Sequence, residues 1–320
     1  MATPKHPTTL QEAIIYFANE DVAFEFFAEI RWPNNTQKCP CCGSERVGFI
    51  KTRKKWQCKE KDCRKQFTLK TGTIMEDSPL GLDKWAVAMW LVCNAKNGIS
   101  SHEVGRALGI TQKSAWFLMH RIRLAMQTGT FEKLSNEVEA DETFIGQKAR
   151  NMHADKRAEK IKGRGASGKA IVLGALERAP EKGKSKVKAK VIKDTEKVTL
   201  KREVKSIVEE GSTLYTDGHS GYESLEEEYI RLVIDHAKAY ANGRIYTNGI
   251  ENFWTLLKRS LKGTYVSVEP FHLFRYLDEQ TFRFNERSGT DSDRFNEAIK
   301  QIAGKRVTYY ELTGKSMREE

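Results

Sequence analysis

The 320-residue chain lacks several features that would assign it to common classes of protein. No apolar run is long enough for a membrane span, so we expect no integral membrane protein. The sequence has no GxxxxGKS/T loop for a nucleotide, no HExxH helix for a zinc hydrolase and no GxSxG turn for a serine nucleophile. It also has no internal repeat, which argues against a solenoid or propeller.

The sequence has fewer acidic residues than basic ones. Lys and Arg number 54 against 43 Asp and Glu, giving a net charge of +11, which favours a polyanionic partner such as nucleic acid. Residues 146–190 hold fourteen basic residues against four acidic ones. The basic runs 156–165 and 181–193 are either solvated loops or guides for the DNA backbone, through contacts that are salt-sensitive and independent of sequence.

Five of the six cysteines lie within 25 residues. Cys39 and Cys42 form a CxxC pair, and Cys58 and Cys63 form a second pair, a pattern that predicts a tetrahedral structural zinc site. Cys41 can replace either neighbour, although the CPxCG knuckle favours Cys39 and Cys42. Because no secretory signal precedes the cluster, we expect reduced thiols and a cytoplasmic protein rather than disulfides.

Residues 82–126 carry the pattern of three successive helices. The first covers 82–98 and is closed by Gly98, Ser100 or Ser101 begins the second, and Thr111 caps the third, over 112–126. The last two predict a helix-turn-helix, with an ordinary helical hairpin as the alternative. If these helices form a helix-turn-helix, we expect the polar residues at the start of the last helix to face base edges and two later arginines to reach phosphates. The polar residues are Thr111, Gln112, Lys113 and Ser114, and the arginines are Arg121 and Arg123.

Three acidic residues stand in contexts suited to holding a metal ion against a phosphate. Asp141 lies in a predicted strand over 138–146, Asp217 near the end of another over 212–218, and Glu251 in a predicted helix over 248–263. Strand alternation places Asp141 and Glu142 on opposite faces, so only one can join a shared site, and we choose Asp141. Carboxylates of this kind hold Mg²⁺, and two ions about 3.5–4 Å apart promote phosphoryl transfer.

Each acid also has a structural alternative. Glu251 can close a capping box with Asn248, and Asp217 followed by Gly218 can be simple turn chemistry. Asp141 is harder to explain in this way, because an inward-facing carboxylate is costly unless it is paired or bound to metal.

Three sequence blocks around these acids resemble the catalytic blocks of DDE transposases from bacterial insertion sequences, in the ISXO-like group that carries an N-terminal zinc ribbon. The blocks are ADETFIG (140–146), TDGHSGY (216–222) and NGIENFWTLLKRSLKGTY (248–265). The similarity covers nearly the whole chain, including CPCCGS (39–44), 56–74 and 272–287. It implies an RNase H-like core built on a mixed α/β sheet, with Asp141, Asp217 and Glu251 as the metal-binding triad.

The resemblance also implies a lysine seven residues after the glutamate, and Lys258 stands there. Seven residues are close to two helical turns, so Lys258 and Glu251 share a helix face, with Trp254 or Thr255 between them. A cation at this place can contact DNA phosphate, and a solvated surface lysine is the alternative.

The order of these patterns predicts the domains. We expect a helical segment (1–35), a zinc ribbon (36–76), a helix-turn-helix region (80–128), a catalytic domain (135–290) and a C-terminal tail (291–320). The resemblance implies cleavage at the ends of an insertion sequence and strand transfer, with two Mg²⁺ ions, or Mn²⁺, and structural Zn²⁺ as cofactors.

The expected partners are the terminal inverted repeats of the element, target DNA and further copies of the chain on DNA, at the bacterial nucleoid and without a membrane. Two other classes stay open. One is a DNA-binding regulator with a zinc ribbon, a helix-turn-helix and an inactive RNase H-like domain, and the other is a structure-selective nuclease.

Overall fold

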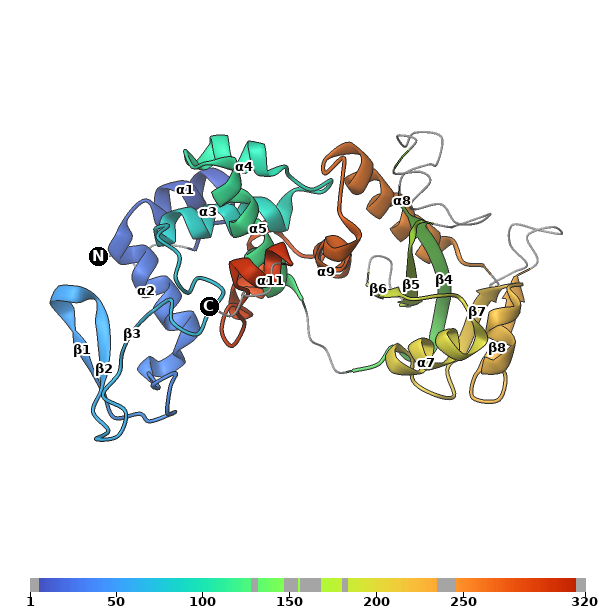
Figure 1. Cartoon of the computed structure of the whole chain (residues 1–320), viewed down its shortest axis with the longest axis horizontal. Helices are drawn as coiled ribbons and strands as arrows, with labels where there is room; N and C mark the ends of the chain where they lie inside the picture. Colours follow the sequence, from blue (N-terminus) through green and yellow to red (C-terminus); the bar gives the residue numbers. More distant parts are fainter. Residues whose placement is uncertain are drawn as a thin grey trace. The chain divides into compact units, whose positions relative to one another are not determined.

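The chain folds into two units, which we describe separately (Figure 1). The computed structural model describes residues 6–127, 132–146, 155, 168–179, 184–234 and 246–314. The N-terminal unit combines residues 1–128 with 289–320, and the second unit contains residues 129–288. The basic run 156–165 lies outside the described residues.

Helices dominate the N-terminal unit. Side-chain caps begin most of them, including capping boxes at Thr9, Ser100, Thr290 and Thr308, which satisfy free backbone N–H groups of the first turn. Residues 291–320, expected as a tail, contain two helices that pack against α3 and α5. The helices are α1 (Leu10–Phe17), α2 (Glu20–Arg31), α3 (Leu82–Asn94), α4 (Ser101–Leu108), α5 (Gln112–Met126), α10 (Asp291–Lys300) and α11 (Tyr309–Thr313).

The zinc-ribbon region is a three-stranded antiparallel sheet of β1 (Val47–Ile50), β2 (Lys55–Cys58) and β3 (Gln66–Thr68). Its core is aromatic: Trp56 stacks on Phe67 and meets Trp32 edge to face, with ring centroids 5.9 and 4.7 Å apart. Arg31, at the end of α2, donates to the carbonyls of Thr68 (3.2 Å), Leu69 and Thr71, which ties the ribbon to the helices.

The helix predicted over 82–98 is too long, because α3 ends at Asn94. The backbone of Ala95 is extended, and Gly98, at a φ of 80°, closes a separate turn in which its N–H donates to the Ala95 carbonyl. Helices α4 and α5 pack against each other. Gly109 makes the turn between them at a left-handed φ of 61°, which costs a residue without Cβ little.

The second unit is built on one mixed sheet in the order β6-β5-β4-β7-β8. Strands β4, β5 and β6 pair antiparallel, whereas β4 pairs parallel with β7, and β7 with β8. The combination of antiparallel and parallel pairs agrees with the mixed sheet that was expected for this unit. The strands are β4 (Glu137–Ile145), β5 (Ala170–Glu177), β6 (Lys186–Ile192), β7 (Thr213–Asp217) and β8 (Ile230–Ile234).

Helices cover both faces of this sheet, which confirms the predicted mixed α/β class (Figure 1). One face buries Val138, Ala140 and Leu173 against α7 (Lys197–Ile207) and the 3-10 helix η4 (Ser220–Leu225). The other buries Val172 and Leu176 against α8 (Asn248–Gly263) and α9 (Leu273–Asn285). Among the described helices, none has both the length and the apolar character needed to cross a bilayer.

Candidate functional site

Asp141 and Asp217 lie at the same level of two adjacent strands. The parallel register pairs Glu139 of β4 with Tyr215 of β7, and each aspartate follows two residues later on its own strand. Side chains two positions apart on a strand point to the same face of the sheet, so both carboxylates lie on the face that α8 covers. The fold therefore brings together two of the three predicted acids, although 76 positions separate them in the sequence.

Trp254 of α8 is a hydrogen-bond partner of Asp141. Its indole Nε1 donates to Asp141 Oδ2 at 2.8 Å. The ring fits here because Gly174 of β5, the cross-strand partner of Asp141, has no side chain. A Cβ at Gly174 would lie 2.5 Å from Trp254 Cη2, closer than real Cβ contacts allow.

The surroundings of Asp141 hold its carboxyl in an unusual state. Its pKa is raised from 3.8 to about 6, mainly by burial and in part by the negative charges of Glu142 and Asp217, whereas the Trp254 hydrogen bond opposes the rise. A carboxylate that is costly to ionise next to other acids gains most from a bound cation.

Glu142 belongs to the opposite face, as strand alternation predicts. The hydroxyl of Tyr222, a fully buried residue of η4, donates to Glu142 Oε2 at 2.5 Å. Burial raises the pKa of Glu142, and burial also raises the pKa of Tyr222 well above its ordinary value. This hydrogen bond therefore holds η4, which begins at Ser220 shortly after Asp217, against β4.

Glu251 lies in the first turn of α8 with an exposed side chain. The alternative that it closes a capping box with Asn248 is wrong, because the helix begins at Asn248 and its N-cap residue is Thr247. Glu251 Oε1 instead accepts a hydrogen bond from Thr247 Oγ1 at 3.1 Å.

Lys258 is half-buried two turns further along α8. Burial lowers its pKa, whereas the charge of Asp141 opposes this shift, so the ammonium group lies within the field of that carboxylate. Trp254 and Lys258 thus approach Asp141 from one face of α8.

Asp217 also has the role in a turn that was its structural alternative, since His219 N donates to Asp217 Oδ1 at 3.0 Å.

The three acids do not form a compact cluster. Within the described parts of the chain, only Cys39, Cys42, Cys58 and Cys63 gather three or more potential metal ligands within 4.8 Å of one another.

The four cysteines fit a zinc ion. Sγ atoms lie 3.7 Å apart in the Cys39 and Cys63 pair and 3.6 Å apart in the Cys42 and Cys58 pair. A tetrahedron with Zn–S bonds of about 2.3 Å has edges of roughly 3.8 Å. Burial raises the pKa of Cys39, but backbone hydrogen bonds from Cys42 and Cys41 bring it down to about 7, which favours thiolate. Cys41 is exposed and outside the group.

The start of α5 presents polar side chains to solvent, whereas its later arginines do not. Thr111, Gln112 and Lys113 are exposed and Ser114 is half-buried. The expectation that Arg121 and Arg123 contact phosphates is wrong, because they are only 3% and 1% exposed.

The partners of Arg121 explain its burial. It donates to the carbonyls of Glu76 (2.5 Å) and Val307 (3.4 Å). Its guanidinium also lies over the Phe117 ring, 4.7 Å from the ring centroid.

Comparison with known proteins identifies two domains in the chain. Residues 133–285 match the ISXO2-like transposase domain, and residues 18–66 match the transposase zinc-ribbon domain. A transposase-like protein of Haemophilus influenzae is 33% identical over 103 residues, which cover 32% of this chain and 83% of that protein. The chain belongs to the ISXO2-like transposase family.

A second relative supports this membership over a longer stretch. A protein in transposable element ISH50 of Halobacterium salinarum is 27% identical over 258 residues, which cover 77% of this chain and 84% of that protein. The transposase-domain match runs from before β4 to the end of α9, and the zinc-ribbon match contains the four clustered cysteines. Membership indicates a transposase, an enzyme of the polynucleotidyl transferase type.

Sequence reasoning on this transposase missed several residues around the acids. The sequence pattern places Trp254 on the helix between Glu251 and Lys258, but it does not predict the hydrogen bond from Trp254 to Asp141. Gly174, in the middle of a strand pattern, was the available signal, because a strand glycine often marks the close approach of another group.

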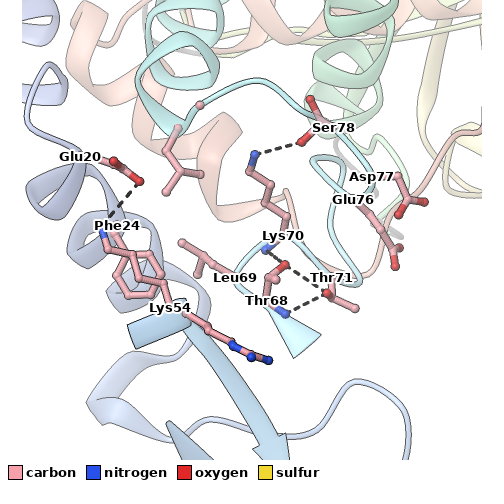
Figure 2. Close-up of a pocket in the computed structure, with 13 residues that line it drawn as sticks. Glu20, Phe24, Lys54, Thr68, Leu69, Lys70, Thr71, Glu76, Asp77 and Ser78 are labelled. Atoms are coloured by element: carbon pink, nitrogen blue, oxygen red, sulfur yellow. Dashed lines mark hydrogen bonds and ion pairs between the residues drawn. The ribbon is translucent and has the colours of Figure 1, made fainter. Parts of the chain in front are cut away.

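The N-terminal unit of the transposase contains a cavity of about 530 Å³ between α2, β3 and residues 69–82 (Figure 2). Lys70 Nζ donates to the carbonyls of Ser78 (3.1 Å) and Leu80, and Lys54 pairs with Asp21 at 2.7 Å. Because protein groups already use these cations, we assign the cavity no ligand. It also lies in a different unit from the three acids.

Proposed function

We propose that this transposase cuts DNA at the ends of its insertion sequence and joins the freed 3′ ends to target DNA. The observation that supports this most is the placement of Asp141 and Asp217 at one level of β4 and β7, under the helix that carries Glu251 and Lys258. In the proposal, Asp141, Asp217 and Glu251 hold two Mg²⁺ ions, or Mn²⁺ in their place.

The donor set fits such ions. Carboxylate oxygens are the ligands that Mg²⁺ prefers. Burial is the main cause that raises the pKa of Asp141 to about 6, and a bound cation would offset the cost of ionising this buried carboxyl. When bound, two Mg²⁺ ions activate the attacking oxygen and stabilise the leaving oxygen of a phosphoryl transfer.

The chain's own groups have separate tasks in this scheme. Trp254 holds Asp141 Oδ2 and so fixes the orientation of the carboxylate. Glu251 is exposed, so its side chain can change rotamer without disturbing the core. Lys258, with its long side chain beside Asp141, contacts a phosphate of the bound DNA.

DNA recognition belongs to the N-terminal unit in this proposal. Helices α4 and α5 act as a helix-turn-helix, and the exposed start of α5 reads the terminal inverted repeats through Thr111, Gln112, Lys113 and Ser114. Two element ends must be held together for strand transfer, so we expect several copies of the chain on DNA, at the nucleoid in the cytoplasm.

A plasmid excision and integration assay tests the proposal. A donor plasmid carrying the element is incubated with the protein and Mg²⁺, and cleaved ends and integrants are counted. We expect Asp141→Ala, Asp217→Ala and Glu251→Ala each to lower the yield by at least about 100-fold, the scale of losing a group that stabilises the transition state. Glu227→Ala, whose side chain is 83% exposed in the same unit, serves as the control and retains activity.

The same assay separates the alternatives. A regulator would bind the element ends but leave every plasmid uncut, and a structure-selective nuclease would cut branched DNA that lacks element ends. Either result contradicts the proposal.

A further inference from the structure

The N-terminus of α8 is capped by a residue from the sheet. Its N-cap residue, Thr247, makes no side-chain cap hydrogen bond, although the first backbone N–H groups of a helix need acceptors. Glu139 of β4 supplies one: its Oε2 accepts from Ile250 N at 2.9 Å, and the N–H of Gly249 also stabilises its charged form. Glu139 is only 1% exposed.

A largely buried arginine completes this cap. Arg178 Nε donates to Glu139 Oε1 at 2.8 Å, and the Arg178 side chain is 11% exposed. Its guanidinium lies over the rings of Tyr215 and Tyr246, 3.8 and 4.2 Å from their centroids, and donates to the Tyr246 carbonyl. Burial raises the pKa of Glu139, but the Ile250 N–H and the Arg178 cation oppose this shift.

The approach of the helix to Glu139 requires glycine at position 249. A Cβ there would lie 2.9 Å from Glu139 Oε2 and 3.1 Å from Leu176 Cδ2. Any larger residue would push α8 away from β4, or Glu139 out of its place.

The cluster of Glu139, Arg178, Tyr215 and Gly249 touches all three segments that carry the acids. Glu139 precedes Asp141 by two residues, Tyr215 precedes Asp217 by two, and Gly249 precedes Glu251 by two. Each contact therefore lies next to an acid on the same element. A displacement of any segment at this cluster moves its acid by a similar amount.

We propose that Glu139 and Arg178 are positioning residues that hold β4, β7 and α8 in register, so that Asp141, Asp217 and Glu251 can share metal ions. The inference rests on the proposed function. Neither residue touches DNA or metal in this scheme, and both act through the segments that they join.

The test measures how end cleavage depends on Mg²⁺ concentration in Glu139→Gln and Arg178→Lys. Removing groups that orient metal ligands usually costs about 10–100-fold in metal affinity or activity. We expect the half-saturating Mg²⁺ concentration to rise about 10-fold or more in both variants, with unchanged affinity for element-end DNA. Saturating Mg²⁺ should restore part of the cleavage rate.

Glu279→Gln is the matched control. Glu279 is a fully buried carboxylate of the same unit that pairs with Arg283 and accepts a hydrogen bond from Tyr265. Arg283 belongs to α9 and Tyr265 follows the end of α8, so these two contacts lie away from β4, from β7 and from the start of α8. Its substitution should lower the melting temperature as much as Glu139→Gln does, without changing the half-saturating Mg²⁺ concentration.

The outcomes are distinct. If Glu139→Gln and Arg178→Lys keep the wild-type Mg²⁺ dependence, or change it no more than Glu279→Gln, the positioning role is wrong while cleavage by the wild type still supports the proposed function. If Glu139→Gln does not fold, Arg178→Lys alone decides. If the wild type binds element ends but never cleaves them, the proposed function itself fails.

Discussion

At the scale of single residues, neighbouring acids have different roles because the strand separates them. Asp141 faces α8 and contacts Trp254, whereas Glu142 faces η4 and accepts from Tyr222. The alternation of a strand was enough to predict this separation from the sequence. It was not enough to predict the partners, which lie 113 and 80 residues away.

Asp141→Asn should stabilise the protein without added Mg²⁺ while abolishing end cleavage. The pKa of Asp141 is raised from 3.8 to about 6 in the fold, mainly by burial, so its ionised form opposes folding. This destabilisation of the folded state is present in full above about pH 6 and is lost as the pH falls below about 4. Asparagine keeps an oxygen acceptor for Trp254 but carries no charge.

Urea unfolding at pH 8 and at pH 4 measures the effect. We expect the free energy of unfolding of the variant to exceed that of the wild type by on the order of 1–3 kcal/mol at pH 8 and to differ little from it at pH 4. An equal gain at both values would show that the charge of Asp141 is not its cause.

At the scale of elements, strong periodic patterns predicted the helices and strands, but not which polar side chains on them are buried. The predicted bounds of the third helix, 112–126, match α5, and those of 248–263 match α8. Arg121 was misplaced because its partners, Glu76 and Val307, are 45 and 186 residues away, and no local pattern reveals them. Cap residues act locally, which is why Thr111 was predictable.

Gly174→Ala should weaken the contact between β5 and α8. The added Cβ would lie 2.5 Å from Trp254, so the indole must shift away from Asp141. Overpacking of this kind costs about 1–3 kcal/mol, and we expect end cleavage to fall as well.

Thermal unfolding and cleavage rates check this prediction, with Gly263→Ala as the control. Gly263 ends α8, and a Cβ there meets no atom within 4 Å. The account of the Trp254 contact is wrong if both glycine variants behave alike.

At the scale of the whole molecule, the chain consists of two units that depend on different chemistry. The N-terminal unit joins two distant stretches of sequence, because α10 packs on α3 and on α5. Its ribbon buries Trp32 and Trp56 beside a cysteine cluster that fits zinc, whereas the sheet unit buries a large apolar core of its own.

Cys58→Ser should therefore remove the bound zinc and loosen the ribbon while the sheet unit stays folded. Cys58 is fully buried and belongs to the cluster, whereas Cys41 is exposed and outside it, so Cys41→Ser is the matched control. Metal analysis should find zinc lost in the first variant and retained in the second, because a closed thiolate site needs all its ligands. Equal zinc content in both would contradict the assignment.

The position of bound Mn²⁺ tests the central claim most directly. Crystals of the protein with element-end DNA and Mn²⁺ would locate the ion by anomalous scattering. We predict a peak within about 2.5 Å of carboxylate oxygens of both Asp141 and Asp217, on the face of the sheet covered by α8. Bound DNA with no Mn²⁺ at these two residues would contradict the account.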